Sequence, residues 1–451
     1  MNAAATDGLP NPQRALAFLT IAIALTMAVL DSAIVNVALP SIARELAIPP
    51  SDAIWVVTAY VLAVTVSLLP LASLGDILGY KRVYWCGLAV FTAASFACAN
   101  AHSLVFLACA RVVQGFGAAG IMSVNIALVR YIYPKAKLGV GVGYTALVVA
   151  VSSAAGPSVA SAILAVAAWQ WLFLVNVPLG ILALFIAARF LPQTPASGHR
   201  FDALSAVLNA VTFGLLIAGL DAFSDADGHA RAALMLAGAA VFGAVFVRRE
   251  RRLAVPMLPV DLLRRPVFAL SMATSICSFA AQNMAYIALP FYFEQALGRS
   301  ETATGFLMTP WPLMTALMAP IAGHLSDRLA PERLGSAGLV VLAAGLACVA
   351  TMGAEPSSFD IGWRLAICGF GFGLFQSPNN RIIIASAPRE RSGGASGLQS
   401  TGRLLGQSMG AAVAAVVFGL VAHGQTALIA WIGAGLSVIG ALSSGLRRTS
   451  L

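Results

Sequence analysis

Residues 16–39 read LAFLTIAIALTMAVLDSAIVNVAL, a run in which Asp31 is the only charged side chain. A hydrocarbon core of about 30 Å is crossed by roughly 20 apolar residues in a helix, so this run is long enough to span a membrane. A carboxylate at membrane depth costs about 2.5–3.5 kcal/mol on insertion scales and as a rule has a function there. The run therefore predicts a membrane helix with a functional carboxylate.

The composition places most of the remaining chain in lipid as well. Of the 451 residues, 59% are hydrophobic and 10% are charged, and the mean hydropathy is +0.86. Soluble domains carry roughly 25% charged residues. The first run lacks a small-residue cleavage site, so we interpret it as a retained span rather than a signal peptide.

The positive net charge and the cysteines do not indicate a nucleic-acid or metal partner. The net charge is +9, but the basic residues lie in short loops and form no stripe interleaved with aromatic residues, so we expect no nucleic-acid binding. The six cysteines lie in apolar runs without a CxxC pair, which favours small buried hydrophobic residues over disulfides or a metal site. No cofactor is predicted.

Fourteen apolar runs of spanning length follow one another along the chain, which predicts an all-helical membrane protein with fourteen transmembrane helices. Most of the 27 lysines and arginines fall in alternate loops, on the side that also holds both ends of the chain. Because cytoplasmic loops are enriched in these residues, both termini are predicted to face the cytoplasm.

The sequence contains an internal repeat. Residues 38–40 (ALP) end the first run and recur as residues 288–290, and the Gly-Asp pair at 75–76 corresponds to Ser-Asp at 326–327. Both copies fall on the same predicted side of the membrane, which indicates a parallel repeat. We predict a six-helix bundle over 1–193, two linker helices with a basic cytoplasmic linker over 194–265, and a second six-helix bundle over 266–451. The arginine-rich end of the linker is also suited to anionic lipid headgroups.

Five segments, each in its own apolar run or the loop after it, carry a family resemblance. They are Leu30–Pro40, Leu74–Arg82, Arg111–Ala119, Ser152–Pro157 and Trp169–Pro178. Together they resemble the major facilitator superfamily and, within it, the branch of drug:proton antiporters with fourteen spans. The resemblance implies two six-helix bundles with two extra helices in a bacterial inner membrane. It also implies proton-coupled efflux of amphipathic, cationic compounds by alternating access. The expected protein is a monomer in the lipid bilayer, and its expected ligands are protons and a small amphipathic substrate.

Two other functional classes remain in view. A proton-coupled transporter of one specific metabolite is the nearer alternative, because the tenth and thirteenth spans carry no acidic residue. A membrane enzyme or receptor is disfavoured because the five histidines are scattered over both predicted sides. The sequence contains no nucleotide-binding glycine-lysine loop, so ATP is not an expected energy source.

Asp31 and Arg111 are predicted to lie at the same depth. Each is seven or eight residues below the same predicted surface, which is roughly 10–12 Å at 1.5 Å per residue. We predict that Arg111 pairs with Asp31 and that Asp31 carries the coupled proton, since a tunable buried carboxylate suits that task. The alternative is a neutral acid that only fixes helix packing.

Two loops and two small-residue clusters are predicted to control gating and packing. In the first loop Asp76, Gly79, Lys81 and Arg82 resemble the family's gating loop, and Asp76 is suited to capping a neighbouring helix. Asp327 and Arg328 form its copy in the second half, where an ordinary capping turn is the alternative. The small residues at Gly115, Gly117, Gly156 and Pro157 are expected to let helices approach closely or bend.

The predicted substrate cavity is apolar and aromatic with a few polar groups, which suits amphipathic molecules better than sugars. For Glu294, substrate contact and plain interfacial solvation are equally favoured, and for Arg403 a structural inter-helix pair is the alternative. The candidate cavity residues are Asn36, Gln114, Gln282, Asn283, Glu294, Trp311, Gln376, Asn379, Asn380, Arg403 and Gln407.

Overall fold

The computed structural model describes residues 8–134, 137–194, 201–222, 228–253, 256, 258, 260–326, 328–386, 392–421 and 424–447. Every regular element in these ranges is helical. This agrees with the sequence, because a backbone in lipid must satisfy its hydrogen bonds internally. The predicted site residue Asp327 lies outside the described residues.

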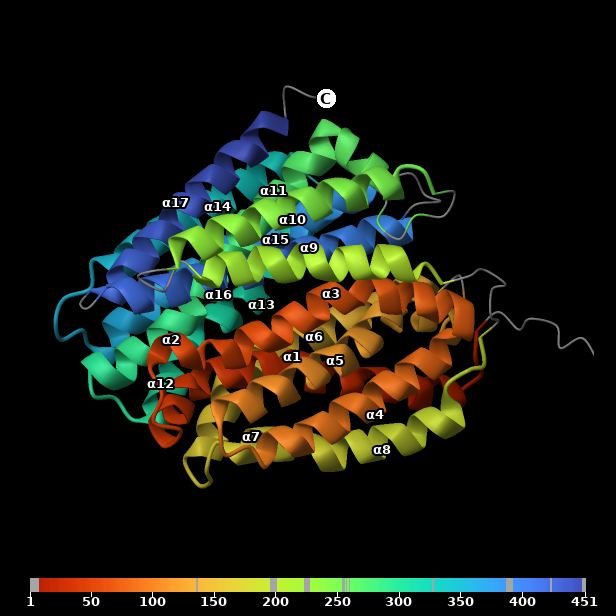
Figure 1. Cartoon of the computed structure of the whole chain (residues 1–451), viewed down its shortest axis with the longest axis horizontal. Helices are drawn as coiled ribbons and strands as arrows, with labels where there is room; N and C mark the ends of the chain where they lie inside the picture. Colours follow the sequence, from red (N-terminus) through yellow and green to blue (C-terminus); the bar gives the residue numbers. More distant parts are fainter. Residues whose placement is uncertain are drawn as a thin grey trace, which may run out of the picture.

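The first group of helices comes from the N-terminal part of the chain and fills the lower half of Figure 1. It comprises α1 (Gln13–Glu45), α2 (Pro50–Ala53), α3 (Trp55–Leu78), α4 (Tyr80–Ala99), α5 (Leu104–Ile132), α6 (Leu138–Leu164), α7 (Gln170–Leu174) and α8 (Asn176–Phe190).

The second group fills the upper half, with two additional helices, α9 and α10, lying along it (Figure 1). The additional helices are α9 (Ala203–Asp221) and α10 (His229–Glu250). The second group comprises η3 (Val260–Arg264), α11 (Pro266–Phe291), η4 (Tyr292–Ala296), α12 (Glu301–Met308), α13 (Pro310–Leu325), α14 (Pro331–Ala350), α15 (Ser358–Ser386), α16 (Ser392–Leu420) and α17 (Gln425–Leu446).

Twelve helical segments are long and apolar enough to cross a membrane, which makes this a multi-pass membrane protein. Three of these segments join a short helix to a longer one across a break: α2 with α3, α7 with α8, and α12 with α13. The helices α11 and α15 have 26 and 29 residues but do not belong to the set of twelve. Fourteen spans therefore remain a prediction. Polar side chains on α11 that are fully buried, including Ser271, Thr274 and Ser278, help to explain its lower hydropathy.

The apolar side chains divide between an interior shared by both groups and a surface that faces outward. The largest buried cluster includes Met284 and Phe291 of α11 and Leu404 of α16 together with most of the N-terminal helices. Large apolar side chains such as Phe185 and Leu234 are 74% and 75% exposed. An apolar surface around a partly polar interior is the arrangement expected of a protein solvated by lipid.

The additional helices α9 and α10 pack on both groups. Asn209 of α9 donates to the carbonyl oxygen of Val66 in α3 at 2.7 Å. Arg249 of α10 and Asp202 at the start of α9 form an ion pair at 3.0 Å. Leu208 and Phe246 join a buried cluster that includes residues of α3, α11 and α16. These helices thus contact the place where the two groups meet.

Candidate functional site

Asp31 lies in the middle of α1 inside the N-terminal group, and its side chain is 1% exposed. One carboxylate oxygen forms an ion pair with the Nη1 of Arg111 on α5. The other oxygen accepts hydrogen bonds from Gln114 at 2.9 Å and from Asn176 on α8 at 3.4 Å. Donors from two further helices therefore solvate this carboxylate in place of water.

Arg111 is also fully satisfied. Its Nε donates to the carbonyl oxygen of Val56 at 2.9 Å, and its Nη1 donates to the Oε1 of Gln114 at 2.6 Å. The guanidinium carbon lies 4.2 Å from the ring centroid of Tyr60 and 5.5 Å from that of Phe173. Such stacking suits arginine in a desolvated site. The charged centre is thus enclosed by α1, α3, α5 and the α7–α8 segment.

The structure brings together Asp31, Arg111 and Gln114, as the sequence predicted for the first two. Their role in proton coupling stays a prediction. Sequence reasoning missed Asn176 and Tyr60 as partners. Asn176 had a detectable signal, because it is an amide in the apolar stretch WLFLVNVPLG at 171–180. Tyr60 had none, since an aromatic residue in a span is ordinarily packing or interface.

Several predicted cavity residues instead belong to the packed interior of the C-terminal group. Trp311 is fully buried and packs edge-to-face on Tyr286 at 5.2 Å, so it is part of the core. Asn379 donates to Ser275 at 2.8 Å and accepts from Arg447 at 2.8 Å. In this structure both side chains are therefore packed rather than open to a ligand, and their assignment to a substrate cavity stays a prediction.

The remaining predicted cavity residues differ in how they are placed. Asn283 is buried and donates to the backbone oxygen of Gln407 at 2.8 Å, which ties α11 to α16. Asn36 is buried, and its Oδ1 has no hydrogen-bond partner among the described residues. The other members are half-buried: Gln282, which is hydrogen-bonded to Tyr286, and Gln376, Asn380, Arg403 and Gln407.

In the loop between α3 and α4, a lysine caps a helix rather than an aspartate. Lys81 donates to the backbone oxygens of Ala188 at 2.9 Å and Leu191 at 2.8 Å, at the C-terminal end of α8. A cation complements the negative end of a helix dipole. Asp76 is exposed and accepts from the hydroxyl of Tyr80 at 2.6 Å. Among the described residues, Asp76 therefore caps no neighbouring helix, contrary to the prediction.

The other residues predicted in the two loops lie at a helix end or on the surface. Gly79 ends α3 with φ of +91°, a conformation that favours glycine. A Cβ there would lie 3.0 Å from the backbone oxygen of Thr194. Arg82 and Arg328 are both exposed at this end of the helices.

The predicted small-residue contacts are present. A Cβ on Gly115 would lie 2.6 Å from the backbone oxygen of Tyr60, and one on Gly117 would lie 2.4 Å from the backbone nitrogen of Phe91. The helix α5 thus approaches α3 and α4 backbone to backbone, as small residues allow in lipid. Gly156 lies against Ala33 of α1, and Pro157 lies inside α6, which remains one continuous helix.

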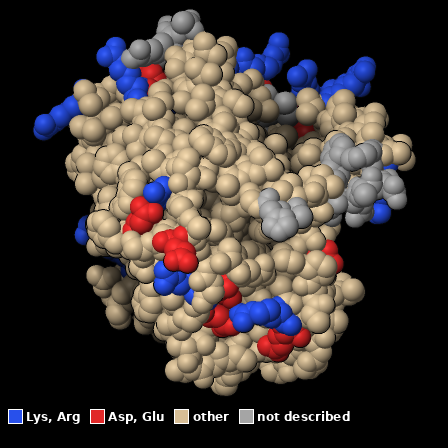
Figure 2. Space-filling model, turned by 90° about the vertical axis from the view of Figure 1, so that its left-hand side faces the viewer, with Lys and Arg blue, Asp and Glu red and all other residues tan. Residues whose placement is uncertain are grey.

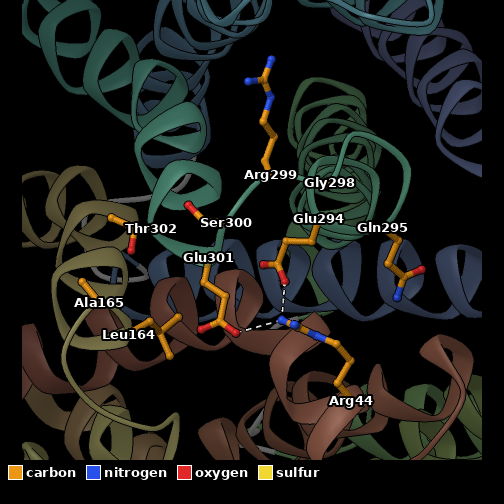
Figure 3. A pocket seen from close by; sticks show the side chains of 10 residues that line it. All are labelled: Arg44, Leu164, Ala165, Glu294, Gln295, Gly298, Arg299, Ser300, Glu301 and Thr302. Atoms are coloured by element: carbon orange, nitrogen blue, oxygen red, sulfur yellow. Dashed lines mark hydrogen bonds and ion pairs between the residues drawn. The ribbon is translucent and has the colours of Figure 1, made fainter.

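A second charged cluster joins the two groups where α1 ends. Arg44 donates to Glu294 at 2.8 Å and to Glu301 at 2.8 Å, so one arginine of the N-terminal group holds two glutamates of the C-terminal group (Figure 3). Arg44 and Glu294 are separated by the same 250 residues as the two copies of the ALP repeat. They therefore occupy equivalent positions in the two halves of the repeat.

We call the end of the molecule that carries this cluster the Arg44 end. Two more contacts join the groups there. Ser158 of α6 lies 2.9 Å from the hydroxyl of Thr309, between α12 and α13. A Cβ on Gly305 of α12 would lie 1.7 Å from the Ser161 hydroxyl. Figure 2 views the molecule from this end, where acidic and basic side chains are mixed on a largely uncharged face.

A cavity of about 580 Å³ opens beside the cluster and is lined by Arg44, Glu294, Arg299 and Glu301 among others (Figure 3). The Glu294 side chain is only 5% exposed, and its Oε1 has no hydrogen-bond partner among the described residues. Burial raises the pKa of Glu294 from 4.5 to about 7, while Arg44 lowers the pKa and Glu301 raises it. Glu294 is thus a buried acidic side chain at the contact between the two helix groups, at the Arg44 end.

Comparisons with known proteins agree with this architecture. The chain is 54% identical to the Uncharacterized transporter YebQ of Escherichia coli, over 98% of this chain and 97% of that protein. It is 31% identical to the Riboflavin transporter RibZ of Clostridioides difficile, over 89% of this chain and 87% of that protein. It is 32% identical to the Multidrug resistance protein Stp of Mycobacterium tuberculosis, over 89% of this chain and 75% of that protein.

A model of the Major Facilitator Superfamily matches residues 21–411. The match covers the Asp31 network, both halves of the Arg44 cluster and Arg403. An all-helical membrane protein built of two helix groups, related to transporters over nearly its full length, is a transporter rather than an enzyme. The chain therefore belongs to the Major Facilitator Superfamily of membrane transporters.

Proposed function

We propose that this protein is a proton-coupled antiporter that exports amphipathic compounds from the cytoplasm by alternating access. The observation that carries the proposal is the enclosed network around Asp31. It contains a carboxylate, an arginine and two amides in the middle of the spans, where each charge is costly. A transporter that used no ion would gain nothing from such a carboxylate.

Protonation of Asp31 changes the energy of the network. A proton neutralises the carboxylate and leaves the buried Arg111 without a counter-ion, with the carbonyl oxygen of Val56 and the amide oxygen of Gln114 as its remaining acceptors. Breaking a buried ion pair in this way costs about 3–5 kcal/mol. A bias of about 5.5 kcal/mol is enough to move a two-state equilibrium from 1:99 to 99:1. Proton binding at Asp31 is therefore large enough to shift the equilibrium between two arrangements of the groups.

The proposal includes a topology. We place α11 and α15 in the membrane with the twelve apolar segments, which gives fourteen spans. Both helices are as long as their neighbours, and their polar side chains face other helices. The Arg44 end then faces outward, because the Lys- and Arg-rich loops gather at the other end. In this arrangement the protein is a monomer in a bacterial inner membrane with both termini in the cytoplasm.

Half-buried amides and a relative support an amphipathic substrate. Gln282, Gln376 and Gln407 offer scattered polar contacts between apolar helices, and the relative Stp is named a multidrug resistance protein. The sequence predicted a cationic substrate, but the structure offers it no free acid in the central parts of the described spans. Asp31 is neutralised by Arg111, and Glu294 pairs with Arg44 at the end of the molecule.

The proposal is tested with Asp31→Asn. Cells that express the protein are compared with empty cells in a growth-inhibition panel of cationic, neutral and anionic amphipathic compounds. A compound with a protective effect is then used in proteoliposomes with an internal pH dye. We expect Asp31→Asn to fold and to lose substrate-dependent proton movement. The matched control is Asp202→Asn, which removes the ion-paired acid of α9. Proton movement that persists in Asp31→Asn would refute the proposal.

A transporter of one specific metabolite is the second candidate. The relative RibZ is named a riboflavin transporter, and in the C-terminal group the acidic residues described lie at helix ends or in loops. The same panel separates the two candidates. Protection against several unrelated compounds supports multidrug export, whereas protection against one chemical family supports a specific transporter.

A further inference from the structure

Arg403 is a cation inside a candidate membrane span, and no acidic side chain among the described residues pairs with it. It lies on α16 (Ser392–Leu420), and its side chain is half-buried. Among the described residues it has no salt bridge and no hydrogen bond, so the structural inter-helix pair considered from the sequence is not formed there. A charged side chain at this depth is costly and is rarely retained without a partner. The missing partner is therefore expected to be a ligand.

Arg403 faces the other helix group rather than lipid. It lies within electrostatic range of the Tyr60 side chain of α3, whose ring stacks on Arg111. Tyr60 is 3% exposed and donates to the backbone oxygen of Ala28 at 3.3 Å. Tyr60 thus lies near both arginines, of which Arg111 is enclosed in the N-terminal group.

Arg403 has a second polar side chain beside it on the same helix. Gln407 is one helical turn further along and on the same face of α16, and it is half-buried. Its side-chain amide has no hydrogen-bond partner among the described residues, whereas its backbone oxygen is bonded to Asn283. A guanidinium and an amide four residues apart offer several donors to one acidic group.

The charges in the central part of the described spans do not balance. Asp31 and Arg111 cancel each other in their ion pair. Arg403 then leaves a net positive charge at the junction of the two groups. A cationic ligand would be repelled there, whereas an anionic ligand would supply the missing counter-charge.

We propose that Arg403, with Gln407, binds the acidic group of an amphipathic organic anion between the two helix groups. The substrate is then a carboxylate, sulfonate or phosphate attached to an apolar body, which reverses the charge expected from the sequence. The proposal rests on the transport function and names the chemical class of the substrate.

The test measures binding of two probes that share one apolar body and differ in charge. The probes are 1-pyrenebutyrate and the corresponding pyrenebutyl-trimethylammonium cation. Energy transfer from protein tryptophan to pyrene reports binding to the full-length protein in an uncharged detergent. The variants are Arg403→Gln and Arg403→Lys, and the control is Arg231→Gln, which removes an exposed positive charge from α10.

We expect the wild-type protein to bind the pyrene anion more tightly than the cation. Arg403→Gln should weaken anion binding by about tenfold, as expected for loss of one desolvated charge-assisted contact, without weakening cation binding. Arg403→Lys should keep the anion preference, and Arg231→Gln should change neither affinity. The proposal is overturned if the two probes bind equally, if neither binds, or if Arg403→Gln weakens both alike. Because binding requires no proton gradient, that outcome would leave proton-coupled export standing.

Discussion

The buried acid at the Arg44 end predicts how pH controls contact between the two helix groups. Where the groups meet, Glu294 has a pKa of about 7 instead of 4.5, chiefly because of burial. In the alternating-access mechanism proposed above, this end opens in the second arrangement and Glu294 regains water. The closed end therefore binds a proton more tightly than the open end. By linkage, the extra stability of the closed end is complete below pH 4.5 and is lost as the pH rises through about 7.

The size of the effect follows from the same values. A rise from 4.5 to about 7 corresponds to about 3 kcal/mol in favour of the closed end when Glu294 is fully protonated. Between pH 8 and pH 6 the ratio of closed to open protein should increase about tenfold, or ~1.4 kcal/mol. In the topology proposed above the Arg44 end faces outward, and an acid that closes this end when protonated would suit a carrier that takes up protons from outside.

Hydrogen exchange measures this equilibrium without labels. Exchange in segment 292–308, corrected for intrinsic rates, should slow about tenfold from pH 8 to pH 6 in the wild type. Glu294→Gln cannot ionise, so it should exchange slowly at both values. The control is Glu355→Gln, which alters an exposed glutamate and should behave like the wild type. Equal pH dependence in the wild type and Glu294→Gln would refute the assigned role, and faster exchange at pH 6 would refute the sign.

Three further perturbations follow from the contacts described. Arg111→Gln should lower the free energy of unfolding in detergent by about 3–5 kcal/mol because it leaves Asp31 buried and unpaired. In thermal melts, the double variant Arg111→Gln with Asp31→Asn should recover part of that loss. A double variant that is less stable than Arg111→Gln would contradict this prediction. Gly305→Ala should abolish transport but not folding. The added Cβ would lie 2.6 Å from the backbone oxygen of Pro157 and would keep the Arg44 end from closing. The control is Gly362→Ala, because a Cβ at Gly362 would point into open space. Lys81→Met should destabilise the protein by about 0.3–1 kcal/mol through loss of the α8 cap, whereas Arg82→Met should leave the melting temperature unchanged; equal losses would argue against capping.

The sequence was informative where distance along a helix decides the outcome. Asp31 and Arg111 lie at similar depths counted from their helix ends, so their pairing followed from the rise of a helix together with the family resemblance, which implies that both helices line the central cavity. The sequence was uninformative where the rotation of a helix about its own axis decides which neighbours a side chain contacts. Trp311 and Asn379 were assigned to a cavity but point into the core of the C-terminal group. The pair Arg44–Glu294 is an intermediate case: the repeat of 250 residues made the two positions equivalent, but nothing in it showed that they touch.

The uneven charge of the central helices has a consequence for the electrical driving force. If Asp31 carries the proton and Arg403 the anion, as proposed above, the centre of the carrier is neutral when Asp31 is ionised and the anion is bound, and membrane voltage does no work on the loaded step. With Asp31 protonated and the anion gone, Arg111 and Arg403 remain as two cations. An interior-negative voltage then draws this form inward, with about 2.3 kcal/mol per 100 mV for each charge that crosses the full field. Voltage would thus accelerate the return of the proton-loaded carrier and leave the export stroke untouched.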